Sequence, residues 1–307
     1  MIYVMKVWFA LFLAFWVSCS RIAADIVYVY SHGLGQSGVS AISYVKDHCL
    51  EKVKAHDVIS NEIKEIPSYS KNTNSFYILN KPLHYFNYPC AHDVGLTIEK
   101  DGTITRKRGV AYPEKVSLAQ HLEIETLKNE IDSIASDCIL FGNSMGAATI
   151  ITYAAQYKPK NVKAIILDAP FDTVERVMQH KLGFWNKLGL GWLYLKYWYP
   201  SYNSKGVKPA NVAHLIETHI PILFVHSKKD ALVPIDASRA LYQAIKESGN
   251  NKVHIFELDH ATHANAHESA DADNYQKVVH AFYKKYNLPC DEQLALKGMQ
   301  LLSTTQP

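Results

Sequence analysis

Short apolar runs recur along the chain, separated by stretches in which apolar residues follow helical spacing. Six runs are rich in Val, Ile, Tyr and Phe, and several do not alternate with polar residues, which is typical of strands buried on both faces. They span residues 26–32, 83–89, 138–144, 163–170, 221–227 and 253–259. The stretches between them predict helices over 38–54, 119–135, 146–157, 236–248 and 273–286. Alternating strands and helices predict an α/β fold with a mainly parallel sheet flanked by helices.

Residues 171–206 interrupt this alternation, because they separate two predicted strands by far more than one helix requires. The segment is rich in Trp and Tyr: Trp185, Trp192, Tyr194, Tyr197, Trp198, Tyr199 and Tyr202. One interpretation is a pair of helices packed on the sheet edge. The other is a helical cap over the functional site, with the aromatic side chains lining an apolar pocket. The pattern is compatible with both.

Composition is that of an ordinary globular protein. The chain has 307 residues, of which 48% are hydrophobic and 20% are charged, which is enough for a sizeable core. A formal net charge of +3 is too weak to indicate a nucleic-acid partner. The most basic stretch, residues 99–108, predicts a solvated hairpin around Asp101-Gly102. No repeat or linker divides residues 25–307, so we expect one domain.

The first residues have the layout of a secretory signal peptide. Lys6 precedes eleven apolar residues, Val7 to Val17, which are followed by small residues. This run is short for a membrane span of about 20 residues. We therefore predict a signal peptide over residues 1–24 and an exported, periplasmic or secreted, protein. Retention as an anchor, or lipidation at Cys19, is the alternative, and either would associate the protein with a membrane through its N-terminus.

Four cysteines follow the predicted signal peptide: Cys49, Cys90, Cys138 and Cys290. An even number in an exported chain permits disulfides. If a disulfide forms, we expect it first between Cys49 and Cys90. Cys138 opens a predicted buried strand, which favours a free thiol.

The stretch "GNSMG" places Ser144 between Gly142 and Gly146, at the end of the strand predicted at 138–144 and before a helix rich in small residues. This is the pattern of a nucleophile elbow, in which a sharp turn lifts a serine hydroxyl clear of the sheet. A side chain at either glycine would crowd the close contact between strand and helix.

A nucleophilic serine needs a base, an acid that orients the base, and donors for the oxyanion. Asp230 follows the strand predicted at 221–227, and His260 and His263 follow the strand predicted at 253–259. The carboxyl ends of parallel strands meet at one edge of the sheet. The order Ser, Asp, His is the order that the α/β-hydrolase arrangement predicts.

These motifs resemble those of the α/β-hydrolase superfamily of serine hydrolases, nearest to its serine-aminopeptidase-like and BEM46-like group. The resemblance covers roughly residues 25–287. "SHGLGQSG" (31–38) is similar to the HG oxyanion loop, and "GNSMG" is similar to the elbow. "LDAPFDTVERV" is similar to the segment that leads into the cap, and "IPILFVHSKKDALVP" is similar to the acid loop.

The resemblance implies Ser144 as nucleophile, Asp230 as acid, a histidine within 260–263 as base, and the N–H groups of Leu34 and Met145 as oxyanion donors. It implies no cofactor. We favour His263 as base because it leaves room for the loop to curl back over the sheet. The family's first two strands are missing, which predicts a sheet of about six strands in chain order 2-1-3-4-5-6.

One competing chemistry is a metal site. Its ligands would be Asp259, His260, His263, His267 and Glu268, which cluster within ten residues. No second cluster of similar density supports it, and we predict no metal. The favoured prediction is an exported serine hydrolase, an esterase, lipase, thioesterase or peptidase, that cleaves an ester, thioester or amide bond of a small-molecule or lipid acyl substrate. The alternatives are an acyltransferase with the same triad and a non-catalytic protein that binds lipid or peptide.

Overall fold

The computed structural model describes residues 26–36, 75–78, 81–91, 96–98, 104–106 and 112–303. The predicted signal peptide (1–24), the helix predicted at 38–54 and Cys49 lie outside these residues. Their assignments remain predictions.

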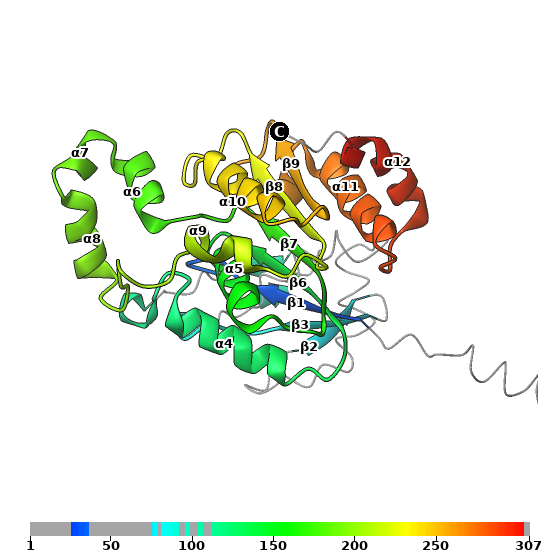
Figure 1. The fold of residues 1–307 in the computed structure, drawn as a ribbon, viewed down its shortest axis with the longest axis horizontal. Helices are drawn as coiled ribbons and strands as arrows, with labels where there is room; N and C mark the ends of the chain where they lie inside the picture. Colours follow the sequence, from blue (N-terminus) through cyan, green and yellow to red (C-terminus); the bar gives the residue numbers. More distant parts are fainter. Residues whose placement is uncertain are drawn as a thin grey trace, which may run out of the picture.

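The core of the molecule is a seven-stranded sheet in the order β2-β3-β1-β6-β7-β8-β9 (Figure 1). The strands are β1 (Val27–Ser31), β2 (Ser75–Ile78), β3 (Lys81–Tyr85), β6 (Cys138–Asn143), β7 (Val162–Asp168), β8 (Ile222–Ser227) and β9 (Val253–Leu258). All neighbours pair in parallel except β2, which runs antiparallel to β3. The parallel strands follow the predicted order 2-1-3-4-5-6.

Two details of the sheet differ from the prediction. The second parallel strand lies at Lys81–Tyr85 rather than at 83–89, and the edge strand β2 raises the count to seven. β2 has only four residues, "SFYI". A strand this short does not show a recognisable alternation of apolar and polar residues, so the sequence pattern did not predict it.

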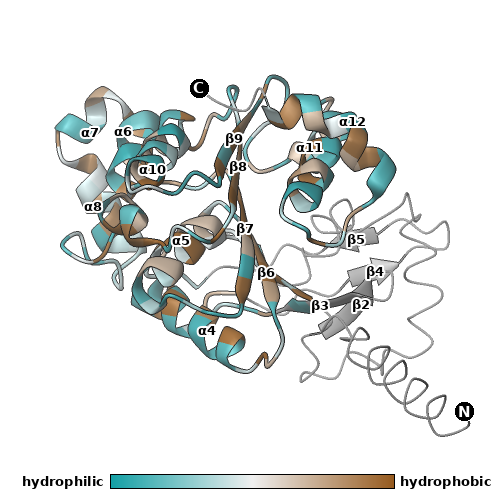
Figure 2. Cartoon of the chain, turned by 45° about the vertical axis from the view of Figure 1, so that its right-hand side comes forward, coloured by the Kyte–Doolittle hydropathy of each residue, from teal (hydrophilic) through white to brown (hydrophobic). Residues whose placement is uncertain are grey.

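Helices cover both faces of the sheet (Figure 2). One core cluster joins one face to α4 (His121–Asp132), α5 (Met145–Tyr157) and α10 (Asp236–Glu247), and the other joins the opposite face to α11 (Ala272–Lys285) and α12 (Glu292–Ser303). Successive strand residues point to opposite faces, so Val29 belongs to the first cluster, and Tyr28 and Tyr30 belong to the second. Burial of both faces explains why the strand sequences do not alternate.

The predicted hairpin is present as two short strands. β4 (Leu96–Ile98) pairs antiparallel with β5 (Ile104–Arg106). The turn that would hold Asp101-Gly102 lies outside the described residues.

The segment between β7 and β8 is helical. It contains α6 (Val174–Leu182), α7 (Phe184–Lys187), α8 (Leu190–Trp198) and α9 (Pro209–Val212). Figure 1 shows α6, α7 and α8 projecting from the end of the α/β body; we call residues 171–206 the cap. Three 3-10 turns complete the described elements: η2 (Pro113–Lys115), η3 (Ala213–Leu215) and η4 (Ala266–Glu268).

None of the helices within the described part of the chain combines the length and the apolarity that crossing a bilayer requires. The cysteines within that part are free. Cys90 and Cys138 are buried, and burial raises the pKa of each thiol to about 12. The structure therefore gives no support to a Cys49–Cys90 disulfide, although Cys49 itself is not described.

Candidate active site

Ser144 occupies a strained turn between β6 and α5. Its φ of 49° and ψ of −116° lie in a region that side chains other than glycine seldom adopt. Its backbone N–H donates to the carbonyl of Asp168 at the end of β7, 2.8 Å away. The surrounding fold therefore holds the serine in this conformation, as the elbow motif predicted.

The two glycines of the motif are required by close contacts. A Cβ added to Gly146 would lie 2.0 Å from the carbonyl oxygen of Ser31 on β1. A Cβ added to Gly142 would lie 2.7 Å from Cδ1 of Ile150 and 2.8 Å from the backbone nitrogen of Ala147. These distances confirm the predicted reason for glycine on both sides of the serine.

A continuous chain of hydrogen bonds joins Ser144, His263 and Asp230. Nε2 of His263 lies 2.8 Å from Oγ of Ser144, and Nδ1 of His263 lies 2.6 Å from Oδ2 of Asp230. Because an ionised carboxylate only accepts, Nδ1 donates to Asp230, and Nε2 is left to accept from the serine hydroxyl. The structure thus brings together three residues that follow β6, β8 and β9. An array of this kind can activate a hydroxyl for attack on a carbonyl carbon.

The Asp230 carboxylate is buried and fully engaged. Oδ1 accepts from the backbone N–H groups of Leu232 and Val233, at 2.8 and 2.9 Å. Burial alone would raise the pKa of Asp230, but the hydrogen bonds from His226 and His263 outweigh it and hold that pKa well below its usual range. The carboxylate is therefore an anion at neutral pH.

His226, which our sequence analysis did not single out, forms a second contact with this carboxylate. Its Nε2 lies 3.3 Å from Oδ2 of Asp230 and 3.0 Å from the carbonyl of Val233. Its Nδ1 lies 2.7 Å from Oγ of Ser238. Because the Val233 carbonyl can only accept, Nε2 carries the hydrogen and Nδ1 accepts from Ser238. The signal in the sequence is a histidine within the buried strand "ILFVHS".

His260 contacts a different carboxylate. Its Nδ1 lies 3.0 Å from Oδ1 of Asp271, and its backbone N–H donates to Oδ2 of the same residue at 2.7 Å. The N–H of Ala261 donates to that oxygen as well, at 2.9 Å. Asp271 thus fixes the start of the loop that carries His263, and the side chain of His260 is 59% exposed.

The five residues of the alternative metal site do not converge: three have partners of their own, and Nε2 of His267 lies 3.4 Å from Oε1 of Glu268. His263 contacts Ser144 and Asp230, His260 contacts Asp271, and Asp259 pairs with Lys228. Within the part of the chain that the structure describes, no three His, Cys, Asp or Glu side chains are grouped so that they can hold a metal ion.

The predicted oxyanion donors lie beside the serine. Leu34 and Met145 line the same pocket as the elbow hydroxyl. Met145 is the first residue of α5, so its N–H has no acceptor within the helix. The loop that carries Leu34 is tied down by Gln36, whose Oε1 accepts from Nδ2 of Asn143 at 2.9 Å.

His32 in this loop is structural. Its Nδ1 donates to the carbonyl of Gly33 at 2.9 Å, and its Nε2 accepts from the N–H of Tyr88 at 3.0 Å. Burial lowers the pKa of His32 to about 4, although the bond to Gly33 acts in the opposite direction. The ring is therefore neutral and holds the β1 loop against the segment that follows β3.

A pocket of about 250 Å³ opens onto Ser144 and His263. Its walls are mostly apolar and come from the cap as well as from the sheet. They are formed by Leu118, Phe171, Val174, Val177, Met178, Tyr194, Leu195, Tyr199, Leu232 and Val233. The cap therefore covers the site, as one of the two interpretations expected. Its aromatic lining is smaller than expected, because Trp185, Trp192 and Trp198 do not line this pocket.

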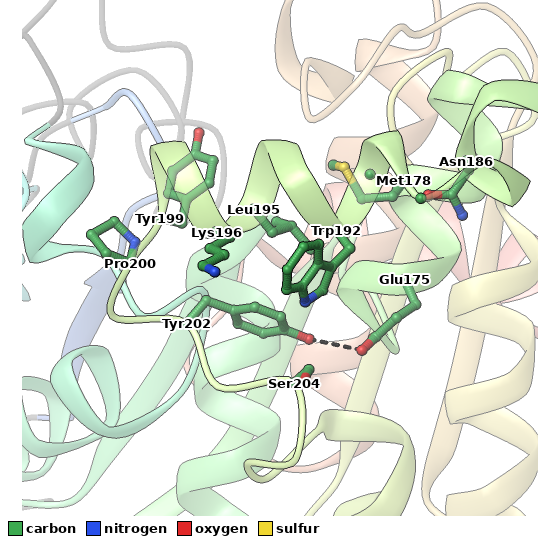
Figure 3. A pocket seen from close by; sticks show the side chains of 12 residues that line it. Glu175, Met178, Asn186, Trp192, Leu195, Lys196, Tyr199, Pro200, Tyr202 and Ser204 are labelled. Atoms are coloured by element: carbon green, nitrogen blue, oxygen red, sulfur yellow. Dashed lines mark hydrogen bonds between the residues drawn. The ribbon is translucent and has the colours of Figure 1, made fainter.

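A second hollow, of about 580 Å³, lies within the cap (Figure 3). In its wall, Oε1 of Glu175 accepts from the hydroxyl of Tyr202 at 3.1 Å and from Nζ of Lys208 at 2.7 Å. None of Ser144, Asp230 and His263 lines it, but Leu195 and Tyr199 of the cap form part of both walls.

Asp168, at the end of β7, is a buried carboxyl group beside the site. Its Oδ2 has no hydrogen-bond partner among the described residues. Burial, reinforced by the negative charge of Asp230, raises the pKa of Asp168 to about 8. This side chain is therefore neutral at neutral pH, whereas Asp230 is ionised.

The chain is similar to two curated bacterial proteins, both described as uncharacterized. It is 29% identical to YqkD of Bacillus subtilis over 154 residues, which are 48% of this chain and 48% of that protein. It is 26% identical to YfhR of Escherichia coli O157:H7 over 124 residues, which are 40% of this chain and 38% of that protein. The alignments therefore span about half of YqkD and less than half of YfhR.

Solved structures share the fold at low sequence identity. The esterase Pf2001 of Pyrococcus furiosus superimposes with a TM-score of 0.54 at 16% identity, over 86% of this chain and 82% of that one. An acylaminoacyl peptidase of Pyrococcus horikoshii gives a TM-score of 0.54 at 14% identity, over 89% of this chain and 38% of that one. Together with the sheet order, these likenesses establish the α/β-hydrolase fold.

The family model of the prolyl oligopeptidase family matches residues 124–288, which are more than half of the chain. The match includes Ser144, Asp230 and His263. It confirms the expected superfamily, whereas the narrower serine-aminopeptidase-like or BEM46-like group remains a prediction. The chain belongs to the prolyl oligopeptidase family, within the α/β-hydrolase superfamily of serine hydrolases.

Proposed function

We propose that this protein cleaves an ester, thioester or amide bond through an acyl-enzyme on Ser144, with His263 as general base and Asp230 as the acid that orients it. The observation that carries the proposal is the hydrogen-bond chain from Oγ of Ser144 through both nitrogens of His263 to Asp230, at 2.8 and 2.6 Å. Membership of a serine hydrolase family supports the same chemistry.

The proposed reaction begins when Oγ of Ser144 attacks the carbonyl carbon and its proton moves to Nε2 of His263. The Asp230 carboxylate, which stays ionised, stabilises the imidazolium that forms. The N–H groups of Leu34 and Met145 receive the negative oxygen of the tetrahedral intermediate. His263 then protonates the leaving group, and water attacks the acyl-enzyme by the same steps in reverse.

The substrate we propose carries an apolar acyl group, as a small molecule or a lipid. Apolar side chains form most of the wall next to Ser144, and the strand ends supply the polar groups at its floor. A pocket with apolar walls and a few polar groups binds its substrate mainly by burying apolar surface, and the polar groups orient the bond that reacts. Export of the protein remains part of the proposal and depends on the N-terminal sequence alone.

Labelling with a fluorophosphonate probe tests the proposal. We expect the wild type to be labelled once, and Ser144→Ala to lose both labelling and ester hydrolysis while its circular dichroism stays unchanged. His260→Ala is the matched control, because it removes a nearby imidazole that makes no contact with Ser144, and it should still be labelled. Labelling that survives in Ser144→Ala would remove this residue from the proposed role. An acyltransferase would instead show products that depend on added alcohol or amine.

A further inference from the structure

The cap exposes an unusual amount of apolar surface. Of the fourteen large hydrophobic side chains that are exposed among the described residues, nine lie between Phe184 and Trp198. We call these nine the cap surface. Tyr197 is 80% exposed, Phe184 67% and Trp185 59%. An exposed apolar patch of this kind marks an interaction site more often than chance.

Pocket formation does not account for this surface. Tyr194 is the only one of the nine that lines the pocket beside Ser144, and Trp192 is the only one that lines the second hollow. The other seven side chains line neither. Figure 1 shows α7 and α8 at the outer end of the cap, away from the sheet, and Figure 2 shows apolar segments along α8.

The charges that follow Glu175 in the cap segment have one sign. Between Glu175 and Glu217 the sequence contains no Asp or Glu, but it contains six cationic residues: Arg176, Lys181, Lys187, Lys196, Lys205 and Lys208. Arg176 and Lys208 pair with carboxylates at the base of the cap. Among the described residues no carboxylate pairs with Lys187, Lys196 or Lys205, and Nζ of Lys196 lies 4.9 Å from the ring centre of Trp192. The partner that this surface fits is therefore apolar and anionic.

We propose that the cap surface docks on an anionic lipid bilayer. Trp and Tyr side chains favour the headgroup level of a bilayer, where the ring is buried and its polar edge stays hydrated. Lysines around them gain from the negative potential of anionic lipids. A second copy of the chain fits less well, because pairing two cap surfaces would bring two sets of unpaired lysines together.

Docking by the cap would place the pocket next to the membrane. Tyr194, Leu195 and Tyr199 of the cap line the pocket beside Ser144, and Tyr194 also belongs to the cap surface. An acyl chain leaving the bilayer would then reach an apolar pocket without crossing much water. This consequence rests on the proposed hydrolase function, whereas the docking itself does not.

Tryptophan fluorescence tests the docking directly. The chain has five tryptophans, of which Trp8 and Trp16 lie in the N-terminal apolar run and the other three lie in the cap. In a full-length Trp8→Phe/Trp16→Phe background, the signal therefore reports only the cap. We expect a blue shift on vesicles of equal parts phosphatidylglycerol and phosphatidylcholine, and quenching when their acyl chains are brominated. Pure phosphatidylcholine vesicles should bind more weakly, and salt should weaken the binding to the mixed vesicles.

Variants then separate the contribution of the apolar side chains to vesicle binding from that of the lysines. Phe184→Ser/Leu193→Ser/Tyr197→Ser keeps all three cap tryptophans, and we expect its partitioning onto mixed vesicles to fall at least about tenfold, because apolar burial drives interfacial binding. Lys187→Gln/Lys205→Gln should weaken the preference for anionic vesicles, because it leaves Lys196 as the remaining lysine of the three without a carboxylate partner. The matched control is Leu296→Ser/Met299→Ser, which removes exposed apolar side chains from α12 and should bind as the parent does.

Three results would overturn the proposal. One is an absence of spectral change on any vesicle, and another is equal partitioning of the triple cap variant and its parent. The third is a blue shift that grows with protein concentration without vesicles, which would identify a second copy as the partner. All these proteins contain residues 1–24, so any membrane affinity of that segment is the same in each variant and in the parent and does not affect the comparison between them. Fluorophosphonate labelling of each variant shows whether the fold and Ser144 are intact, so failure of docking is distinguishable from failure of the hydrolase function.

Discussion

The imidazole of His226 lies against the carboxylate of Asp230, with Nε2 of the histidine 3.3 Å from Oδ2 of the aspartate. His226 is fully buried. Oδ2 of Asp230 therefore lies between two imidazoles, that of His226 and that of His263 at 2.6 Å. The His226 contact helps to keep Asp230 ionised against the cost of its burial.

We predict that His226 is a positioning residue for the proposed reaction. His226→Leu removes the donor to Asp230, and we expect kcat to fall about tenfold, the equivalent of one weakened hydrogen bond to a charged group. KM should change little, because His226 does not line the pocket. His226→Gln keeps an N–H donor of similar reach and should recover most of the loss. Steady-state kinetics on one ester measures all three proteins.

A purely structural role for His226 makes a different prediction. Both variants would then lose thermal stability together, and kcat per folded molecule would stay at the wild-type value. Active-site titration with the fluorophosphonate probe counts the folded molecules and separates the two outcomes.

His263 and His260 should differ sharply as sites of substitution. His263→Ala removes the only imidazole among the described residues that contacts Ser144, so we expect kcat/KM to fall by roughly three orders of magnitude or more. His260→Ala leaves the hydrogen bonds from the His260 and Ala261 backbone to Asp271 in place, and its loss should be no more than a few fold. Hydrolysis rates on one ester compare the two variants. The reverse ranking would make His260 the base, and equal modest losses would contradict both assignments.

Asp168 should make folding stability depend on pH. The pKa of Asp168 is raised to about 8 in the folded protein and is about 3.9 in an unfolded chain. Between these values the folded state keeps a proton that the unfolded state has lost, so the contribution of Asp168 to stability falls as pH rises from about 4 to about 8. Asp168→Asn cannot ionise, and its free energy of unfolding should exceed that of the wild type increasingly over this window.

Urea unfolding of both proteins across that pH range measures the difference. The two stabilities should be similar near pH 4, diverge up to about pH 8 and stay apart above it. Curves that remain parallel throughout would show that Asp168 is ionised in the folded state.

The sequence was sufficient for the parts of the site that depend on local patterns. Ser144 is marked by flanking glycines that a tight contact requires, and Asp230 and His263 each follow a mainly apolar strand, "ILFVHS" and "VHIFEL" respectively. The parallel strands other than β3 were recognisable with close bounds because burial on both faces makes them mainly apolar. The bounds predicted for β3 were wrong, because its sequence "KPLHY" is not a continuous apolar run. The edge strand β2 has four residues and lacks such a run, so pattern alone did not reveal it.

Contacts between residues far apart in the sequence could not be predicted in the same way. The role of His226 depends on where the loop from Asp230 to Val233 folds back, and nothing in "VHS" specifies that contact. The aromatic residues of the cap posed a similar problem. Their density predicted an apolar lining, but the side on which each ring of α8 lies depends on how the cap packs on the body. Tyr194 and Tyr199 face the pocket, while Trp198 is exposed.

The apolar pocket predicts a dependence on acyl length. We expect kcat/KM for p-nitrophenyl esters to rise from the acetyl ester to a medium chain, by at most about fourfold per carbon, since a buried methylene is worth about 0.8 kcal/mol. The rise should then stop, because a pocket of about 250 Å³ is small for a ligand site. Val177 of α6 forms part of the wall and is 9% exposed. Val177→Phe should therefore shift the optimum to a shorter ester.

The matched control is Leu193→Phe, a change of similar kind on α8 at a side chain that is 52% exposed and does not line the pocket. Its length profile should follow that of the wild type. All esters must be measured below the concentration at which they aggregate, because aggregated substrate would imitate a preference for long chains. A wild-type profile that falls from the acetyl ester onward would contradict an apolar acyl site and favour a small or polar substrate. An unchanged optimum in Val177→Phe would place the acyl group elsewhere, and the larger hollow bounded by Trp192 and Tyr202 would be the next site to alter.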